Sequence, residues 1–359
     1  MESFFSVCFC YRHQRIISFL AIILLLSFIG HRNSNHQVYS MNILALDIGG
    51  SKLIAALLFV DDSRFEIYSE AHRALVADCR QEQLLTLIDD AVSELGNITF
   101  ERVGVTIPGL ADPRHGIWIY ACFSGIRDFP IAQILSDKYG SKPIAIENDV
   151  NACALAEKKF GKCRELNDFL WITVSNGIGG GLILNGEVYS GHFGAAAEIG
   201  HFGVVDFMDG CQPPIQCGCG HFGCLEAEAA GPGIAKRYAR RLQEQQKLNP
   251  SIPVPILPPY TAQKVAELAR SGDTIALSVM ETTGTLLGKA ASYAVNLLNL
   301  EAVILGGGVA QSFDLLLPSL EKSFRSRLFQ NANPSVKLEQ TGLGYRAGLA
   351  GAAALTLFQ

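Results

Sequence analysis

Three cysteines lie within eight residues of one another, and such a cluster is typical of a metal site: Cys217, Cys219 and Cys224. A structural zinc ion takes four nitrogen or sulfur ligands in a tetrahedron, so one more ligand is needed. We take His201 as this ligand, with Cys211 and His221 as alternatives. Four protein ligands leave no open position for catalysis, so the prediction is a structural zinc site. The opposing interpretation is a set of buried free cysteines.

Glycine-rich turns follow three apolar runs that we expect to be strands. The runs Asn42–Leu46, Phe169–Val174 and Ala302–Leu305 lead into Asp47–Lys52, Ser175–Gly181 and Gly306–Gly308. Glycines let backbone N–H groups approach phosphate oxygens without interference from a Cβ atom. No P-loop motif is present in the sequence. The three turns together predict a single nucleotide site formed by the following residues: Asp47, Gly49, Gly50, Ser51, Lys52, Asn176, Gly177, Gly179, Gly180, Gly307 and Gly308.

The segment Glu147-Asn148-Asp149 lies where a strand over 143–146 meets a helix over 151–160. A carboxylate at such a junction can accept the proton of a hydroxyl group that attacks a phosphate. Asn and Asp are also favoured as helix N-caps, which would be a purely structural role. The residues by themselves leave both interpretations open.

The elements that carry these motifs repeat along the chain. A strand, a glycine turn and a second strand occur twice, about 130 residues apart, without a helix between the strands, which indicates hairpins and not a dinucleotide-binding crossover. Two similar α/β halves that face each other across a cleft are therefore expected. Helical spacing predicts helices over 81–95, 274–300 and 347–357, and the second should bury one apolar face: Leu286, Leu287, Ala290, Ala294, Leu297 and Leu298.

Composition excludes several classes of protein. The 359 residues suffice for two packed domains, and the net charge of −5 without a basic stripe gives no support for a nucleic-acid surface. The ten cysteines are scattered apart from the one cluster, which indicates reduced thiols and not a secreted disulfide framework.

The N-terminal segment calls for a separate interpretation. The apolar run over 16–29 is short for a bilayer span, which needs about 20 residues, and no clear signal cleavage site follows it. Met41 begins a sequence that reads as the first strand of a globular domain. We favour residues 1–40 as an upstream extension from a misassigned start codon, with a membrane anchor or a cleaved signal as alternatives. The expected location is the cytoplasm, or a membrane if the segment is translated.

These motifs together resemble those of the ROK family of sugar kinases and sugar-sensing repressors. The resemblance covers Met41–Gln359 and rests on five segments: Leu46–Lys52, Glu147–Ala152, Gly177–Gly181, Glu198–His201 and Cys217–Glu226. It implies the two-domain, ribonuclease-H-like fold of the actin/hexokinase type, with an interdomain cleft. The expected smaller domain comprises 41–148 and about 345–359, and the larger domain, 149–344, contains the zinc loop.

The resemblance also implies an activity. It indicates ATP-dependent phosphorylation of a hexose, at the 6-hydroxyl, with Mg²⁺ and a structural Zn²⁺. Glucose is favoured by analogy, and N-acetylglucosamine or N-acetylmannosamine are alternatives. Asp149 is the implied catalytic base, and His201 would bind zinc with one ring nitrogen and sugar with the other. We expect a homodimer without a nucleic-acid partner, and the implied sugar-binding residues are as follows: Gly109, Asn148, Asp149, Glu198, His201 and Glu226.

The sequence departs from the family pattern in three places. The spacing between His201 and Cys217 is about six residues longer than usual, so Cys211 lies near the usual position of the first cysteine. The segment Ala121–Ser124 lacks an asparagine often found there, and Ser175-Asn176 replaces a more usual Gly-Thr.

Two other functions compete with that of a kinase. One is a repressor, but about 40 residues precede the first strand and they offer no recognition helix. The other is a sugar-binding protein without catalysis, against which the retention of Asp149 and both phosphate turns argues.

Overall fold

The computed structural model describes residues 40–359 except 62, 77, 97–98, 122–123, 207–212, 250–258, 330–332 and 359. Some residues discussed above lie outside the described part of the chain. These are the predicted N-terminal extension up to Tyr39, the two residues Cys122 and Phe123, and the alternative zinc ligand Cys211. Residues Ser40–Gln359 form one compact unit. Within the described part, no helix combines the length and the apolar character that crossing a membrane requires.

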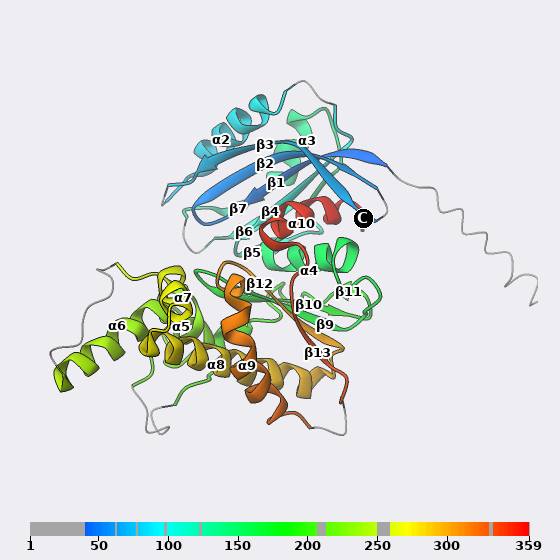
Figure 1. The fold of residues 1–359 in the computed structure, drawn as a ribbon. Coiled ribbons are helices and arrows are strands. Elements are labelled where there is room, and N and C mark those ends of the chain that lie inside the picture. Colours follow the sequence, from blue (N-terminus) through cyan, green and yellow to red (C-terminus); the bar gives the residue numbers. More distant parts are fainter. Residues whose placement is uncertain are drawn as a thin grey trace, which may run out of the picture. The chain divides into compact units, whose positions relative to one another are not determined.

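Two five-stranded sheets form the framework of this unit (Figure 1). The first has the order β3 (Phe65–Ala74), β2 (Lys52–Val60), β1 (Met41–Ile48), β4 (Arg102–Ile107) and β8 (Ile144–Asn148). The second has the order β11 (Glu187–Val188), β10 (Ile178–Leu184), β9 (Phe169–Val174), β12 (Ala302–Gly306) and β13 (Lys337–Gln340). A small third sheet contains β5 (Leu110–Asp112), β6 (Ile117–Tyr120) and β7 (Arg127–Phe129).

The two large sheets share one topology. In the first, β1 pairs with β2 antiparallel and with β4 parallel. In the second, β9 pairs with β10 antiparallel and with β12 parallel. The two predicted hairpins are therefore confirmed, and each lies next to parallel strands whose carboxyl ends point toward the same edge as its turn.

The central strands are buried on both faces, which explains their nearly continuous apolar sequences. In β1, Ile43 and Ala45 belong to one core cluster, while Leu44 and Leu46 belong to another. This division follows from the alternation of side chains along a strand.

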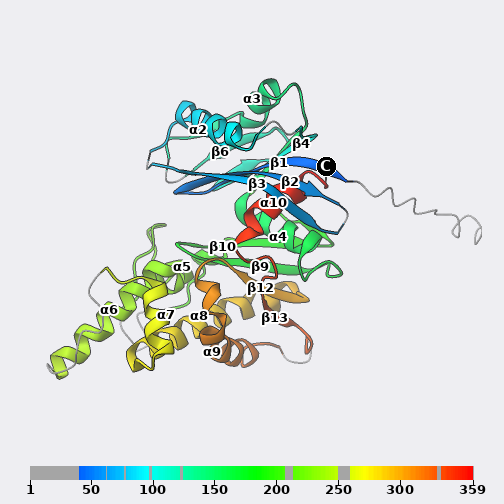
Figure 2. The same ribbon diagram turned by 45° about the horizontal axis from the view of Figure 1, so that its top comes forward.

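Helices α4 (Asp149–Phe160) and α10 (Ala347–Leu355) lie between the two sheets and pack against each other (Figure 2). Helix α10 contacts β1 and β4, whereas α4 contacts β9 and β10. Small residues permit this close packing, because a Cβ atom on Gly351 would lie 2.8 Å from the backbone of Ala152, and one on Gly104 would lie 1.7 Å from the carbonyl oxygen of Ala352. The layer of two helices thus links the sheets tightly.

Further helices cover the outer faces of the sheets. Helix α2 (Gln81–Glu94) contacts β2 and β3, and α3 (Ile131–Lys138) contacts β8. The second sheet shares a core with these helices: α5 (Leu225–Ala229), α6 (Gly231–Leu248), α7 (Ala262–Arg270), α8 (Thr274–Leu298) and α9 (Phe313–Arg325). Short 3₁₀ turns complete the set: η1 (Ile199–His201), η2 (Val309–Ser312) and η3 (Gly344–Arg346).

The end of α8 corrects one sequence prediction. The helix was expected to continue to Leu300 and to bury Leu297, but it ends at Leu298 and the Leu297 side chain is 78% exposed. Asn299 adopts a left-handed conformation with φ of 54° and terminates the helix. Helical spacing identifies an apolar face, but it does not tell where the elements that cover this face end.

Candidate active site and metal centre

The first glycine turn connects β1 to β2. Ile48 pairs with Leu53, so the turn comprises the four residues between them, and the Gly49 N–H donates to the Lys52 carbonyl oxygen at 2.8 Å. Asp47 lies just before the turn, and its Oδ1 atom accepts a hydrogen bond from the Thr106 hydroxyl at 2.7 Å. The turn therefore presents backbone groups next to a fixed carboxylate.

The second glycine turn is shorter than predicted. Strand β10 begins at Ile178, so the turn comprises only Ser175–Gly177, and Gly179 and Gly180 lie within the strand. A Cβ atom on Gly179 would lie 3.1 Å from the Val150 side chain, and one on Gly180 would lie 2.5 Å from the Ala197 carbonyl oxygen. These glycines thus make room for neighbouring segments on opposite faces of the strand. The phosphate contact that the sequence predicts for them stays a prediction.

The third turn follows β12. Gly307 has φ of 89°, and a Cβ atom there would lie 2.6 Å from the Val174 carbonyl oxygen. Glycine is therefore required both by the backbone conformation and by the close approach to β9. The turn brings Gly308 beside Ser175, whose Oγ atom is 3.7 Å from the Cβ position of Gly308.

Asn148, and not Asp149, caps α4. The Asn148 Oδ1 atom accepts from the N–H groups of Val150 at 2.9 Å and Asn151 at 3.2 Å, while its Nδ2 atom donates to the Gly109 carbonyl oxygen at 2.9 Å. This arrangement separates the two roles that the sequence left open. The capping role falls on Asn148, and the Asp149 carboxylate accepts the neighbouring Val150 N–H at 3.0 Å.

Burial and the negative charge of Asp47 raise the pKa of Asp149 to about 7. Both effects disfavour the ionised form of a carboxyl group. A second carboxyl group lies directly behind the junction: Glu147 is buried and accepts from the Asn148 N–H at 2.8 Å and from Asn151 Nδ2 at 3.2 Å. Sequence reasoning did not assign Glu147 a role, although a carboxylate at the end of an apolar strand was a visible signal.

The predicted metal ligands converge. One ligand atom from each of His201, Cys217, Cys219 and Cys224 lies within 4.8 Å of all the others. His201 Nδ1 is 3.6 Å from Cys217 Sγ, and the Sγ atoms of Cys219 and Cys224 are 3.7 Å apart. A tetrahedron with Zn–S bonds of about 2.3 Å has edges of about 3.8 Å, so this donor set fits zinc.

The alternative ligand His221 has a different position. Its Nδ1 atom faces Cys219 Sγ at 3.5 Å, and it is not a member of the four-residue group. Hydrogen bonding from His221 lowers the pKa of the Cys219 thiol to about 6, which favours the thiolate that a metal requires.

The other predicted sugar ligands lie around this cluster. While His201 Nδ1 faces Cys217, its Nε2 atom lies 3.8 Å from Glu198 Oε2, and both side chains are partly exposed. Glu226 lies on α5, and its Oε2 atom accepts from the Ile178 N–H at 3.0 Å. The structure thus brings Glu226 next to the second glycine turn and His201 next to Glu198.

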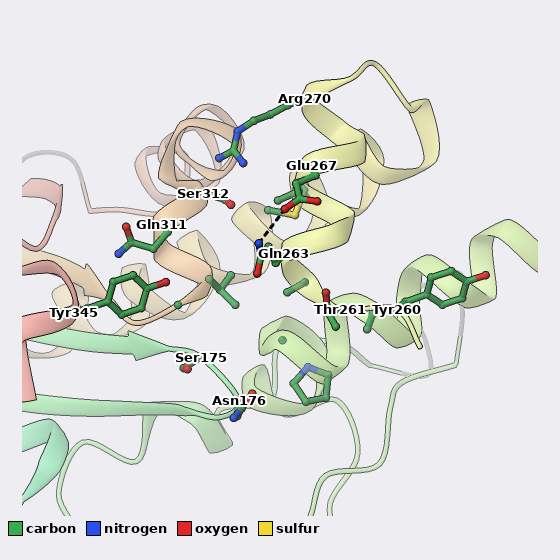
Figure 3. A pocket seen from close by; sticks show the side chains of 18 residues that line it. Ser175, Asn176, Tyr260, Thr261, Gln263, Glu267, Arg270, Gln311, Ser312 and Tyr345 are labelled. Atoms are coloured by element: carbon green, nitrogen blue, oxygen red, sulfur yellow. Dashed lines mark hydrogen bonds between the residues drawn. The ribbon is translucent and has the colours of Figure 1, made fainter. Parts of the chain in front are cut away.

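A cavity of about 640 Å³ adjoins the second and third glycine turns (Figure 3). Asn176 and Gly308 belong to its lining, and helix α7 and the segment around Tyr345 contribute side chains that the sequence did not predict: Thr261, Gln263, Glu267, Arg270 and Tyr345. Its volume is in the range of small-molecule sites. These residues come from distant segments, so no local motif could have identified them.

The sequence profile of the ROK family matches residues 43–358. The chain belongs to the ROK family. The glucokinase of Halalkalibacterium halodurans is 32% identical over 249 residues, which are 69% of this chain and 74% of that protein. The N-acetylglucosamine repressor of Escherichia coli O157:H7 is 29% identical over 247 residues, 69% of this chain but only 58% of the repressor.

Structural comparison leads to the same family. The ROK family glucokinase from Streptomyces griseus, solved in complex with glucose and AMPPNP, has a TM-score of 0.71 and 29% identity, covering 88% of this chain and 98% of that one. The predicted two-domain fold of the actin/hexokinase type is confirmed for this ROK protein.

Proposed function

We propose that this ROK family sugar kinase transfers the γ-phosphoryl group of ATP to the 6-hydroxyl of a hexose, with Asp149 as the general base. The position of the Asp149 carboxylate carries the proposal. The carboxylate lies at the start of α4 near Asp47. Asn148 caps the helix in place of Asp149, and the pKa of Asp149 is raised to about 7. A base whose pKa is near the working pH combines a large ionised fraction with adequate basicity.

In the proposed reaction the sugar oxygen forms a bond to the γ-phosphorus as its proton moves to Asp149. The bond from this phosphorus to the β–γ bridging oxygen breaks, and ADP leaves with that electron pair. The turns at Gly49–Lys52, Ser175–Gly177 and Gly307–Gly308 supply N–H groups for the phosphates, and the cavity of about 640 Å³ accommodates the nucleoside. Asp47 would hold Mg²⁺ together with the phosphates, and this ion supplies positive charge to the transferred group.

The proposed sugar contacts come from Glu198, His201, Glu226 and the junction at Asn148 and Gly109. Because the Asn148 oxygen already accepts two hydrogen bonds, we assign Asn148 to holding Gly109 in place and to contacting sugar through its remaining amide hydrogen. Glucose is the proposed substrate, with N-acetylglucosamine and N-acetylmannosamine as the alternatives. The proposed smaller domain, 41–148 with 345–359, closes on the larger one, 149–344, in a cytoplasmic homodimer.

Zinc has a structural role in this proposal. With Nδ1 on the metal, the His201 ring is fixed and its Nε2 atom is directed away from the cluster toward the Glu198 side chain. Cys219→Ser should therefore lose bound zinc and raise the KM for the hexose, as measured by metal analysis and steady-state kinetics. A zinc-free variant with an unchanged KM would contradict this role.

An ATP-coupled assay over a panel of hexoses tests the proposed reaction. We expect turnover with the preferred sugar, a loss of about 10²–10⁴-fold in kcat in Asp149→Asn, and retained sugar binding by calorimetry. Asp90→Asn, a change on the exposed face of α2, serves as the control. The similarity to a repressor supports a second candidate, a sugar-sensing protein without turnover. Tight sugar binding without activity on any hexose would favour that candidate.

A further inference from the structure

Helix α5 contacts both the metal cluster and the second glycine turn. It begins directly after Cys224, and the carboxylate of Glu226 accepts the N–H of Ile178 at 3.0 Å. A Cβ atom on Gly177 would lie 2.7 Å from the same carboxylate, so Glu226 packs directly against the turn. The position of α5 therefore determines where the cluster lies relative to the turn.

A buried carboxylate on the same helix binds the segment just before the metal loop, by which we mean Cys217–Cys224. Glu228 is 2% exposed, and its Oε1 atom accepts the N–H of Ile215 at 2.6 Å, two residues before Cys217. Its Oε2 atom pairs with Arg237 of α6, whose Nη2 atom also donates to the Glu228 carbonyl oxygen at 3.2 Å. The side chains of this pair are 3% and 10% exposed, so both charges are largely removed from water.

The metal loop and the glycine turn are not packed directly against each other. A cavity of about 260 Å³ lies between them and is lined by both: Asn176 from the turn, Gln216, Cys217 and Gly218 from the loop, and Glu226 and Lys236 from the helices. Packing across this gap is therefore incomplete, and α5 is one of two connections to the turn. The other is η1, where a Cβ atom on Gly200 would lie 2.0 Å from the Ile178 carbonyl oxygen.

A buried ion pair is a poor source of net stability, because desolvation of the two charges offsets their attraction. Its geometry is specific, however, since the carboxylate must satisfy the guanidinium and the Ile215 N–H together. We infer that Glu228 and Arg237 are positioning residues that hold the metal loop and the second glycine turn in register through α5. This inference rests on the proposed function, because it links zinc retention to the binding of sugar and ATP.

The test uses the full chain loaded with zinc. In Arg237→Met and Glu228→Gln, zinc release to a chromogenic chelator should become about tenfold faster, as for partners that orient metal ligands. The KM values for hexose and ATP should rise together, while kcat changes less. Arg73→Ala is the control. It removes an arginine of β3 that pairs with two acidic residues of α2, and it should leave zinc release and both KM values unchanged.

A double variant separates positioning from stability. Glu228→Leu combined with Arg237→Met removes both buried charges, so thermal stability should recover relative to Arg237→Met, yet zinc release should remain fast because Ile215 loses its acceptor. It also provides the measurement if a single variant fails to fold. Wild-type zinc release and KM values in the folded variants would overturn the inference. Wild-type protein that binds no zinc or shows no kinase activity would instead overturn the proposed function, and both are measured first.

Discussion

Asp149 and Asp47 come from different elements, but their charges interact at the candidate site. Asp149 is the first residue of α4 and Asp47 is the second-last residue of β1, so each carboxylate lies near an element end. The negative charge of Asp47 and burial both raise the pKa of Asp149. Burial first, and the nearby charge of Asp47 second, therefore set the basicity of the proposed base.

The raised pKa predicts how activity depends on pH. Asp149 must be ionised to accept a proton, so kcat/KM should fall about tenfold per pH unit below an apparent pKa of about 7. In Asp47→Asn the acidic limb of the pH profile should move to lower pH, because one of the two effects that raise the pKa of Asp149 is removed. A pH profile of kcat/KM for both proteins measures this, and an unshifted limb in the variant would contradict the assignment.

The raised pKa of Asp149 affects stability in the opposite direction from activity. Between the ordinary pKa of 3.8 and about 7, the folded protein binds the Asp149 proton more tightly than the unfolded chain does. The contribution of this group to the free energy of unfolding therefore decreases as pH rises through that window. The stability that is lost accompanies the gain of the active, ionised base.

Ala197 precedes the proposed sugar ligand Glu198 in a conformation that favours glycine. Its φ is 62°, which costs about 1–2 kcal/mol for a residue with a Cβ atom. Glycine loses about 0.5–1 kcal/mol through the greater freedom of the unfolded chain. Ala197→Gly should therefore raise the free energy of unfolding by up to about 1 kcal/mol, and Ala197→Val should lower it. Urea denaturation of both variants decides this, and destabilisation by glycine would show that the Ala197 methyl contact dominates.

At the scale of elements, β10 packs against two parts of the candidate site, α4 and the segment before η1. Gly179 and Gly181 face α4, while Gly180 faces the segment before η1. The alternation of a strand thus directs one glycine toward the segment before η1 and two toward α4. Close packing on both faces of the strand is therefore one reason for the run of glycines.

Gly181→Ala should consequently disturb α4. The new methyl group would lie 2.6 Å from the Val150 carbonyl oxygen and 2.9 Å from the Ala154 Cβ atom. We expect a loss of about 1–3 kcal/mol in stability, from overpacking, and a fall in kcat because Asp149 moves with the helix. Gly125→Ala is the matched control, since its Cβ atom would meet nothing within 4 Å. Equal kinetics and thermal stability of the two variants would contradict the role of β10.

At the scale of the whole described unit, the link between the sheets continues into the segment that leads to α10. Glu157, fully buried on α4, accepts from the Thr341 hydroxyl at 2.6 Å, the Gly342 N–H at 3.2 Å and the Lys162 N–H at 2.8 Å. Residues 341–342 connect β13 with η3 and α10. One carboxylate therefore fastens α4 to the connection between the second sheet and α10.

Removal of this carboxylate should weaken the whole unit. Glu157→Ala leaves the buried Thr341 hydroxyl and the partly buried N–H groups of Gly342 and Lys162 without their acceptor, and we expect a loss on the order of 3 kcal/mol in the free energy of unfolding. Thr341→Val removes one of the three hydrogen bonds and should cost less, about 1 kcal/mol. Denaturant unfolding measures both, and equal effects of the two variants would show that the three contacts are not cumulative.

The sequence alone was sufficient for the features that depend on local pattern. Apolar runs with glycine turns identified both hairpins, and the cysteine spacing with His201 identified four residues whose ligand atoms lie within 4.8 Å of one another. Such patterns are short, and their geometry follows from a few neighbouring residues.

Only the tertiary structure decided how neighbouring residues divide their roles. Asn148, and not Asp149, caps α4, Gly179 and Gly180 make room for neighbouring segments, and Glu228 forms an ion pair with Arg237. Two of these outcomes involve a partner remote in the sequence: Gly109 for Asn148 and Ala197 for Gly180. Local spacing contains no information on which distant backbone will approach, because packing of the whole unit determines it.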